Sequence, residues 1–290
     1  MNKTQNLIKA SNNALVFSLL ATMTLMFGCG GGSSSGTVAE ETTTSTSSST
    51  SVPLISPGAY VASMNGKDWV SMLLPTTQGS GAVTNFYGIH YNAADPDIYS
   101  GAGTFTDTNN TATLTRVFFY PNISAAVRSG TGTVSNLGNG IVRATLSFPA
   151  TGIEQGKDIN VAASPPSNYK YNTPATLSAV QGSWQGRWSY GFGSVEDFSV
   201  SISNLGALTS AMSFQQDCKL TQGALLPNFD GTNLFTFSVT IPTATQCSLK
   251  NQTLNGAAFV TTSPVAGKTQ RLYIIGVTTD GRGISYKADR

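Results

Sequence analysis

The chain has 290 residues, of which 16 are basic and 14 acidic, so only 10% are charged and the formal net charge is +2 at pH 7. Because nucleic-acid binding needs a strongly basic surface, this balance predicts no nucleic-acid partner. The single histidine, His90, excludes metal sites built from several histidines and leaves one imidazole for acid–base chemistry near neutral pH. We therefore expect no catalytic site, no metal and no cofactor, and predict that the protein is not an enzyme.

An apolar segment, residues 14–27, follows Lys3 and Lys9 near the start of the chain. It is too short to span a bilayer as a stable helix, but it has the length of the hydrophobic region of a signal peptide. The segment runs into Leu25-Met26-Phe27-Gly28-Cys29, where a small residue directly precedes a cysteine. This sequence resembles the lipobox of bacterial lipoproteins.

The resemblance to a lipobox implies that residues 1–28 are a lipoprotein signal peptide. It also implies that Cys29 becomes the lipidated first residue of the mature chain, with palmitate among its acyl groups. In this class of protein, a residue other than aspartate after the cysteine, here Gly30, implies sorting to the outer membrane. We therefore expect a protein anchored in the outer membrane, on its periplasmic face or at the cell surface. The alternative is an ordinary secretory signal with an incidental cysteine.

Residues 29–52 form a predicted linker, in which 18 of the 23 residues after Cys29 are glycine, serine or threonine. Such a composition cannot bury a hydrophobic core and is typical of a flexible coil, with an end-to-end distance of roughly 25 Å. The linker would hold a folded body away from a bilayer. Removal of the signal peptide also removes Lys3 and Lys9, so the mature chain has 14 basic and 14 acidic residues.

From about residue 53 onward, short runs of β-branched and aromatic residues are separated by glycine, asparagine, aspartate and proline. This pattern is typical of antiparallel β-structure. We therefore predict an all-β protein with two small antiparallel β-domains, each a barrel or a sandwich. The clearest strands are expected at residues 111–120, 141–148, 195–202, 234–241 and 271–278.

One short helix is predicted between the two halves of this β-structure, at residues 173–180. Thr173 can cap the helix, Pro174 occupies its first position, and Gly182 supplies a left-handed stop. We place a domain boundary at this helix, near residue 170.

The boundary divides the folded part into an N-terminal β-domain at 53–170 and a C-terminal β-domain at 171–290. Each is large enough to enclose its own core. The sequence Ser-Asn-Leu-Gly occurs at 135–138 and again at 203–206. This echo indicates either two related halves or two uses of one turn.

The second half contains eight strand-like runs, a number that suits an up-and-down barrel, although a sandwich would show the same periodicity. The first run opens at Gly182-Ser183-Trp184, which resembles the opening of the first strand in calycin or lipocalin-like barrels. The resemblance implies that Trp184 closes one end of a barrel, and that an arginine near the end of the chain, Arg271 or Arg282, packs across it. The eight runs are 183–190, 195–202, 207–214, 219–225, 234–241, 254–261, 271–278 and 283–288.

Two cysteines, Cys218 and Cys247, remain once Cys29 is assigned to the lipid anchor. An exported chain with two remaining cysteines is expected to oxidise them to a disulfide bond. Closing a loop of this length would stabilise the fold by about 3–4 kcal/mol through the unfolded state. We therefore predict a structural bridge, and no free thiol in the mature protein.

The densest cluster of aromatic and polar residues lies at 85–92 and contains Tyr87, His90 and Tyr91. These three residues are candidates for lining a ligand cleft. Aromatic residues that alternate along a strand also pack as one face of a barrel or sandwich, so a core role is the alternative.

A second group of candidates is Trp184, Arg187 and Trp188. The two tryptophans differ by four positions and so project to one face of an extended strand, whereas Arg187 projects to the other. An exposed Trp188 would provide a surface for stacking against a sugar. A buried Trp188 would instead belong to the core.

Carboxylates offer the alternative in which the protein is an enzyme. Asp95, Asp97 and Glu154 could meet in space and form the carboxylate pair of a hydrolase that acts on envelope glycans. Asp95 and Asp97 could also bind calcium, but the full calcium-loop pattern is absent and Asp-Pro-Asp is ordinary turn chemistry. Glu196 and Asp197 are adjacent on a strand and face opposite sides, which argues against a catalytic pair there.

The features together predict a lipid-anchored lipoprotein of the cell envelope with a binding or interaction role. Besides the membrane, its candidate partners are a small apolar ligand inside a barrel, an envelope glycan or another envelope protein. An internal apolar cavity would favour a small ligand. A filled interior would favour interaction through the surface.

Overall fold

The computed structural model describes most of the chain from residue 55 onward, all within one compact unit, Ser49–Arg290. The predicted signal peptide, Cys29, the linker, Asp95 and the predicted Cys218–Cys247 bridge lie outside the described residues. The described residues are 55–75, 83–91, 96–104, 110–121, 126–152, 154–170, 173–189, 195–210, 220, 222–229, 231–242 and 249–290.

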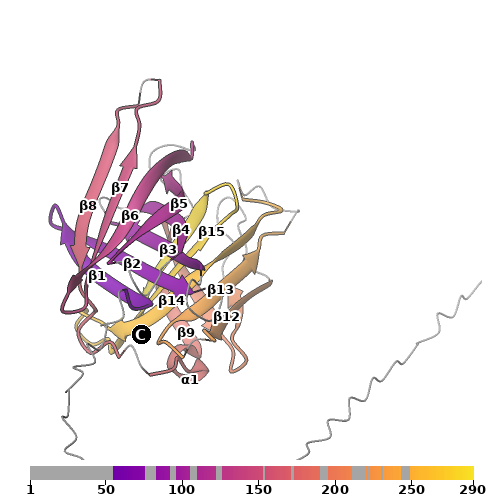
Figure 1. Ribbon diagram of the computed structural model, residues 1–290. Helices are drawn as coiled ribbons and strands as arrows, with labels where there is room; N and C mark the ends of the chain where they lie inside the picture. The colour runs from indigo at the N-terminus through magenta and orange to yellow at the C-terminus, as the bar shows by residue number, and fades with distance from the viewer. Residues whose placement is uncertain are drawn as a thin grey trace, which may run out of the picture. The chain divides into compact units, whose positions relative to one another are not determined.

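The described part of the chain is almost entirely antiparallel β-structure, arranged as two eight-stranded sheets (Figure 1). In the first sheet the strands lie in chain order, each paired with the next. Val61 exchanges two backbone hydrogen bonds with Ser164, at 2.7 and 3.0 Å, so this sheet nearly closes on itself. Its strands are β1 (Gly58–Met64), β2 (Lys67–Pro75), β3 (Val83–His90), β4 (Asp97–Thr104), β5 (Thr111–Tyr120), β6 (Arg128–Gly138), β7 (Ile141–Phe148) and β8 (Lys157–Ala163).

The second sheet is a closed up-and-down barrel, in which the last strand pairs with the first from Ser285–Ser189 to Asp289–Gln185. This result confirms the all-β prediction and decides for a barrel over a sandwich in this half. The strands are β9 (Gly182–Ser189), β10 (Val195–Ile202), β11 (Ala207–Ser210), β12 (Gln222–Pro227), β13 (Phe235–Thr240), β14 (Thr253–Thr262), β15 (Gln270–Val277) and β16 (Gly283–Asp289).

Among the described residues, apolar and aromatic side chains pack inside both sheets. Inside the first sheet, Tyr99 stacks on Phe119 with ring centroids 5.0 Å apart, and Phe148 packs against both rings. Inside the barrel, Trp188 packs against Phe198 and Tyr286. One alternative was a small apolar ligand inside the barrel. The three aromatic side chains occupy part of the space that such a ligand would need.

A third group of buried residues lies between the two sheets. It joins outer-face residues of β2, β3 and β4 to those of β14 and β15. Strands β2 and β15 are therefore buried on both faces, which explains their nearly continuous apolar sequences. Central members of this shared core are Val70, Met72, Tyr87, Ile89, Phe259, Tyr273 and Ile275.

The short helix α1 spans Leu177–Val180 with Thr176 at its N-cap, so the prediction that Thr173 caps it and Pro174 occupies its first position was wrong. The Ala175 backbone N–H donates to Thr232 O at 3.1 Å, which ties this segment to the barrel rather than to a helix. Thr176 then has an extended backbone and precedes the first turn. Gly182 has a φ of +113°, a value that favours glycine, and it begins β9.

Trp184 is buried at one end of the barrel, beside α1. Its Nε1 donates to Val180 O at 2.6 Å, and the guanidinium of Arg290 lies 4.2 Å from its ring centroid. The arginine that packs across Trp184 is thus Arg290, whereas Arg271 and Arg282 pair with Asp289 and Asp280. The prediction of Arg271 or Arg282 was wrong. Strand β16 reaches the Trp184 end of the barrel only at its last residues, where Asp289 pairs with Gln185, and Arg290 follows directly.

Candidate functional site

The structure separates the predicted ligand-binding residues into core residues and cavity residues. Tyr87 is buried in the core between the sheets, and this burial raises the pKa of its hydroxyl to about 12. His90 is buried near Trp69, with Nε2 3.2 Å from Met64 O, and burial lowers the pKa of its imidazole. Trp184 is a core residue of the barrel. None of these three is among the residues that line the cavity described next.

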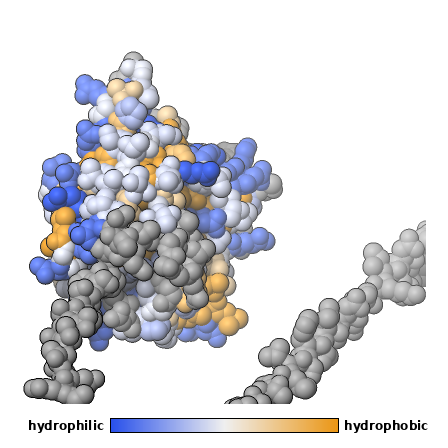
Figure 2. Space-filling view, in the orientation of Figure 1, coloured by the Kyte–Doolittle hydropathy of each residue, from blue (hydrophilic) through white to orange (hydrophobic). Residues whose placement is uncertain are grey.

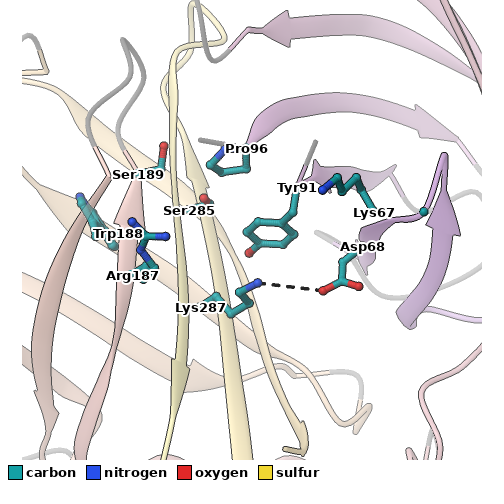
Figure 3. Close-up of a pocket in the computed structure, with 10 residues that line it drawn as sticks. Lys67, Asp68, Tyr91, Pro96, Arg187, Trp188, Ser189, Ser285 and Lys287 are labelled. Carbon is teal, nitrogen blue, oxygen red and sulfur yellow. Dashed lines mark ion pairs between the residues drawn. The ribbon is translucent and has the colours of Figure 1, made fainter. Parts of the chain in front are cut away.

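A cavity of about 300 Å³ lies between the two sheets (Figure 3). Three of the predicted ligand-binding residues, Tyr91, Arg187 and Trp188, are among the residues that line it. One wall comes from β9 and β16 of the barrel. The opposite wall comes from the β1–β2 turn and from the ends of β3 and β4 in the first sheet. Its lining residues are Gly66, Lys67, Asp68, Tyr91, Pro96, Arg187, Trp188, Ser189, Ser285 and Lys287.

The barrel wall of this cavity is built from two cross-strand pairs. Arg187 lies directly opposite Lys287, and Ser189 lies directly opposite Ser285. Side chains alternate between the two faces of a strand, so these four project outward while Trp188 projects into the barrel core. Figure 3 shows Trp188 on the far side of β9 from Arg187.

A tight hairpin positions the opposite wall. Asn65 and Gly66 form the two-residue turn between β1 and β2, with φ values of +55° and +72°, as the favoured hairpin turns require. This turn places Lys67 and Asp68 at the start of β2, beside the cavity. The Tyr91 backbone N–H donates to Asp68 O at 2.9 Å, which holds Tyr91 on the same wall.

The two walls meet at Lys287. Its Nζ lies 4.0 Å from Asp68 Oδ2 and 4.1 Å from the centroid of the Tyr91 ring, in a cation–π arrangement (Figure 3). Burial, followed by the nearby charge of Arg271, lowers the pKa of Lys287. Burial also raises the pKa of the Tyr91 hydroxyl well above its usual value, so this group is neutral near physiological pH.

Two hydroxyl groups of the cavity lining are buried without a hydrogen-bond partner among the described residues. They are Ser189 Oγ and Tyr91 Oη. A buried polar group without a partner costs about 1–3 kcal/mol, so native proteins rarely leave two in one place. Both lie at a cavity large enough to admit a partner, and they mark it as a site for a polar group.

A second hollow of about 280 Å³ adjoins the first, because Asp68 lines both. It is lined mainly by apolar and hydroxyl-bearing residues. Arg271, its one basic residue, is held by Asp289 through two hydrogen bonds of 2.8 and 2.9 Å. The lining residues are Val61, Ala62, Asp68, Trp69, Val70, Pro166, Ser167, Thr261, Thr262, Pro264, Arg271 and Tyr273.

The described carboxylates considered for hydrolysis are each bound to a cation. Asp97 is 1% exposed, and its Oδ2 accepts from Lys157 Nζ at 2.6 Å. Glu154 lies 3.5 Å from the Nε of Arg128. Asp68 is the single carboxylate in the lining of each of the two cavities.

Within the described residues, the side chains of histidine, cysteine, aspartate and glutamate form no group of three that could hold a metal ion. The helix in this part of the chain is also too short to cross a membrane.

Sequence reasoning singled out Tyr91 and Arg187 but missed Lys67, Ser189, Ser285 and Lys287. A usable signal was present in the strands: Arg187 and Ser189 alternate with core residues, and so do Ser285 and Lys287. In a chain that is only 10% charged, two basic residues on neighbouring strands are uncommon. Their meeting depends on the pairing of the first and last barrel strands, about 100 residues apart.

No protein-family model, curated protein or solved structure matches this chain. Its function is therefore argued from its own residues.

Proposed function

We propose that the protein is a lipoprotein anchored in the outer membrane by Cys29, and that its folded part binds a small polar ligand in the cavity between the two sheets. The lipobox-like sequence and the linker after it support the anchor. The cavity supports the binding role, and the observation that carries it is the pair of buried hydroxyls, Ser189 Oγ and Tyr91 Oη, that lack a partner among the described residues.

A binding role fits the chemistry of the lining better than a hydrolytic one. Glycoside hydrolysis needs two carboxyl groups on opposite sides of the scissile bond, and the lining contains one carboxylate, Asp68. Hydroxyl, ammonium and guanidinium groups predominate instead, and these hold a ligand through hydrogen bonds. A cavity with a few convergent polar groups is typical of a small-molecule site.

The binding role can be tested by blocking the cavity. The full mature protein, purified in detergent, is dialysed against a small-molecule extract of the envelope, and retained compounds are identified by mass spectrometry. We expect a compound that the native protein enriches and that Ser189→Trp does not, because the indole fills the cavity.

The matched control is Ser238→Trp, which places the same side chain at an exposed position on β13. This variant should enrich the compound like the native protein. The proposal fails if the native protein enriches nothing, or if Ser189→Trp enriches the same compounds as the native protein.

The anchor is tested separately by membrane fractionation of Cys29→Ala. Without the acylated thiol, the variant should leave the membrane pellet and appear in the soluble fraction. Retention in the pellet at the native level would contradict lipid anchoring through this residue.

A further inference from the structure

We propose that the ligand of this cavity carries an oxyanion, a carboxylate or a phosphate group, which binds Arg187, Lys287 and Ser189 on the barrel wall. The inference rests on the proposed binding function, because it assigns a chemical class to the ligand of that same site. It follows from the charge and the hydrogen-bonding capacity of the wall residues, and from the burial of Ser189 and the partial burial of Lys287.

The barrel wall of the cavity carries two basic side chains. Arg187 and Lys287 lie directly opposite each other on paired antiparallel strands, an arrangement that is unfavourable for like charges. Lys67 adds a third basic group to the lining, and Asp68 is its one acidic group. The cavity thus has an excess of positive charge in a chain whose mature form is neutral overall.

The carboxylates near these cations compensate them weakly. Asp197 Oδ1 lies 3.7 Å from Arg187 Nε, and Asp68 Oδ2 lies 4.0 Å from Lys287 Nζ, both near the upper limit for an ion pair. Their side chains are 92% and 62% exposed, so solvent screens both interactions. In contrast, Arg271 nearby is held at 2.8 Å by Asp289 and needs no further anion.

The cavity lining is also rich in hydrogen-bond donors. The side chains of lysine and arginine only donate hydrogen bonds, and a hydroxyl group can also donate one to an acceptor on a ligand. Ser189 Oγ and Tyr91 Oη are buried and lack a partner among the described residues, and Ser285 lies opposite Ser189. An oxyanion has several lone pairs and can accept from more than one of these groups, which a neutral group with one acceptor does not.

Lys287 is partly shielded from water. The Lys287 side chain is 26% exposed and packs on the Tyr91 ring, so its ammonium has already lost part of its hydration. A charge that is partly removed from water interacts more strongly with a bound counter-ion than an exposed charge does. A metal cation is disfavoured at the same place, because three basic side chains surround it.

The test compares two pairs of probes by ligand-observed NMR on the full mature protein in detergent, at constant ionic strength. Acetate is compared with acetamide, which has the same shape without the charge, through saturation transfer to their methyl groups. Inorganic phosphate is followed by its ³¹P line width. Acetate and phosphate together distinguish a carboxylate source from a phosphate source.

We expect saturation transfer to acetate, or broadening of phosphate, and little transfer to acetamide. Lys287→Met removes the charge but keeps most of the aliphatic part of the side chain. It should lower the affinity for the oxyanion about tenfold. Ser189→Ala should weaken it less, by a few-fold. Lys268→Met, at an exposed lysine that does not line the cavity, is the matched control and should bind like the native protein.

Failure of this inference can be told apart from failure of the proposed function. If acetamide binds as well as acetate and Ser189→Trp abolishes both, the cavity is a ligand site but the oxyanion assignment is wrong. The assignment is also wrong if Lys287→Met leaves oxyanion binding unchanged. If no probe binds and the native protein enriches no compound from the extract, both proposals are overturned.

Discussion

At the scale of single residues, several polar atoms of the cavity lining lack close hydrogen-bond or ion-pair partners among the described residues. Lys287 has an exposed carboxylate at 4.0 Å, and the hydroxyls of Tyr91 and Ser189 have no partner among the described residues. The other buried cations are better satisfied: Arg271 by Asp289, and Arg128 by three backbone carbonyl groups. Lys287 is thus less well compensated than Arg271, which supports the proposed ligand site.

The lowered pKa of Lys287 predicts how anion binding depends on pH. Lys287 is charged below its pKa, and burial places that pKa below the ordinary lysine value. Acetate affinity should therefore be constant near neutral pH and fall as the pH rises through the lowered pKa, before an exposed lysine would titrate. Tyr91 does not ionise in this range.

This pH dependence can be measured by saturation transfer to acetate between about pH 6 and pH 10. In Lys287→Met the decline should disappear, because the titrating group is gone. A decline of the same size in that variant would assign the titration to another group.

Arg290 predicts a contribution of the last residue to stability. Its guanidinium lies over the Trp184 ring and donates to Ala179 O and to Gln270 Oε1. Arg290→Met should lower the free energy of unfolding by about 1–3 kcal/mol, measured by urea denaturation. Arg282→Met, which removes a surface pair with Asp280, should cost less than about 1 kcal/mol. Equal losses would contradict the role assigned to Arg290.

At the scale of secondary-structure elements, the site depends on the pairing of β9 with β16. Gly186 pairs with Ala288, and a Cβ atom at Gly186 would lie 2.1 Å from the backbone oxygen of Lys287. That contact is with backbone, which cannot move aside as a flexible side chain can. The close approach of the two strands at this position therefore requires glycine.

Gly186→Ala should separate β9 from β16 locally and destabilise the fold by about 2–4 kcal/mol. The variant should also bind the ligand less tightly, since Arg187 and Lys287 flank the distorted pair. Gly156→Ala is the matched control, because a Cβ atom there meets its nearest neighbour at 3.5 Å. A native melting temperature for Gly186→Ala would contradict the required close approach.

The sequence predicted elements well where one face of a strand meets solvent. The predicted strands 111–120, 141–148 and 195–202 coincide with β5, β7 and β10. In β7, for example, buried and exposed residues alternate along the strand. The eight runs of the second half correspond to the eight barrel strands, with ends that differ by a few residues.

The sequence was less informative where burial on both faces removes alternation. Strand β2 packs against the barrel as well as against the first sheet's interior, so its sequence carries no two-residue period. The cavity was only partly predictable for a related reason. Arg187 and Lys287 become neighbours through barrel closure, and no local pattern encodes the pairing of the first strand with the last.

At the scale of the whole folded part, the two sheets share a core. Residues of β2 and β3 pack with Phe259, Tyr273 and Ile275 of the barrel. The Ser-Asn-Leu-Gly echo does not relate the two sheets, because 135–138 precedes the seventh strand of the first sheet and 203–206 precedes the third strand of the barrel. Both copies end in a glycine with positive φ, as two uses of one turn would.

The shared core predicts that the two sheets unfold together. Separating them would expose Phe259, Tyr273 and Ile275 to water, which costs about 1.5–3 kcal/mol for each large side chain. Differential scanning calorimetry of the mature protein should therefore give one transition, with equal calorimetric and van't Hoff enthalpies. Two separate transitions would show that the sheets are independent domains.

The measurement that tests the ligand site most directly is competitive acetylation of lysines, read residue by residue by mass spectrometry, with and without phosphate or acetate. Lys287 lies inside the cavity, and Lys268 lies exposed outside it. We expect the oxyanion to slow acetylation of Lys287 several-fold and to leave acetylation of Lys268 unchanged. If Lys287 reacts at the same rate with and without both anions, the cavity does not bind an oxyanion.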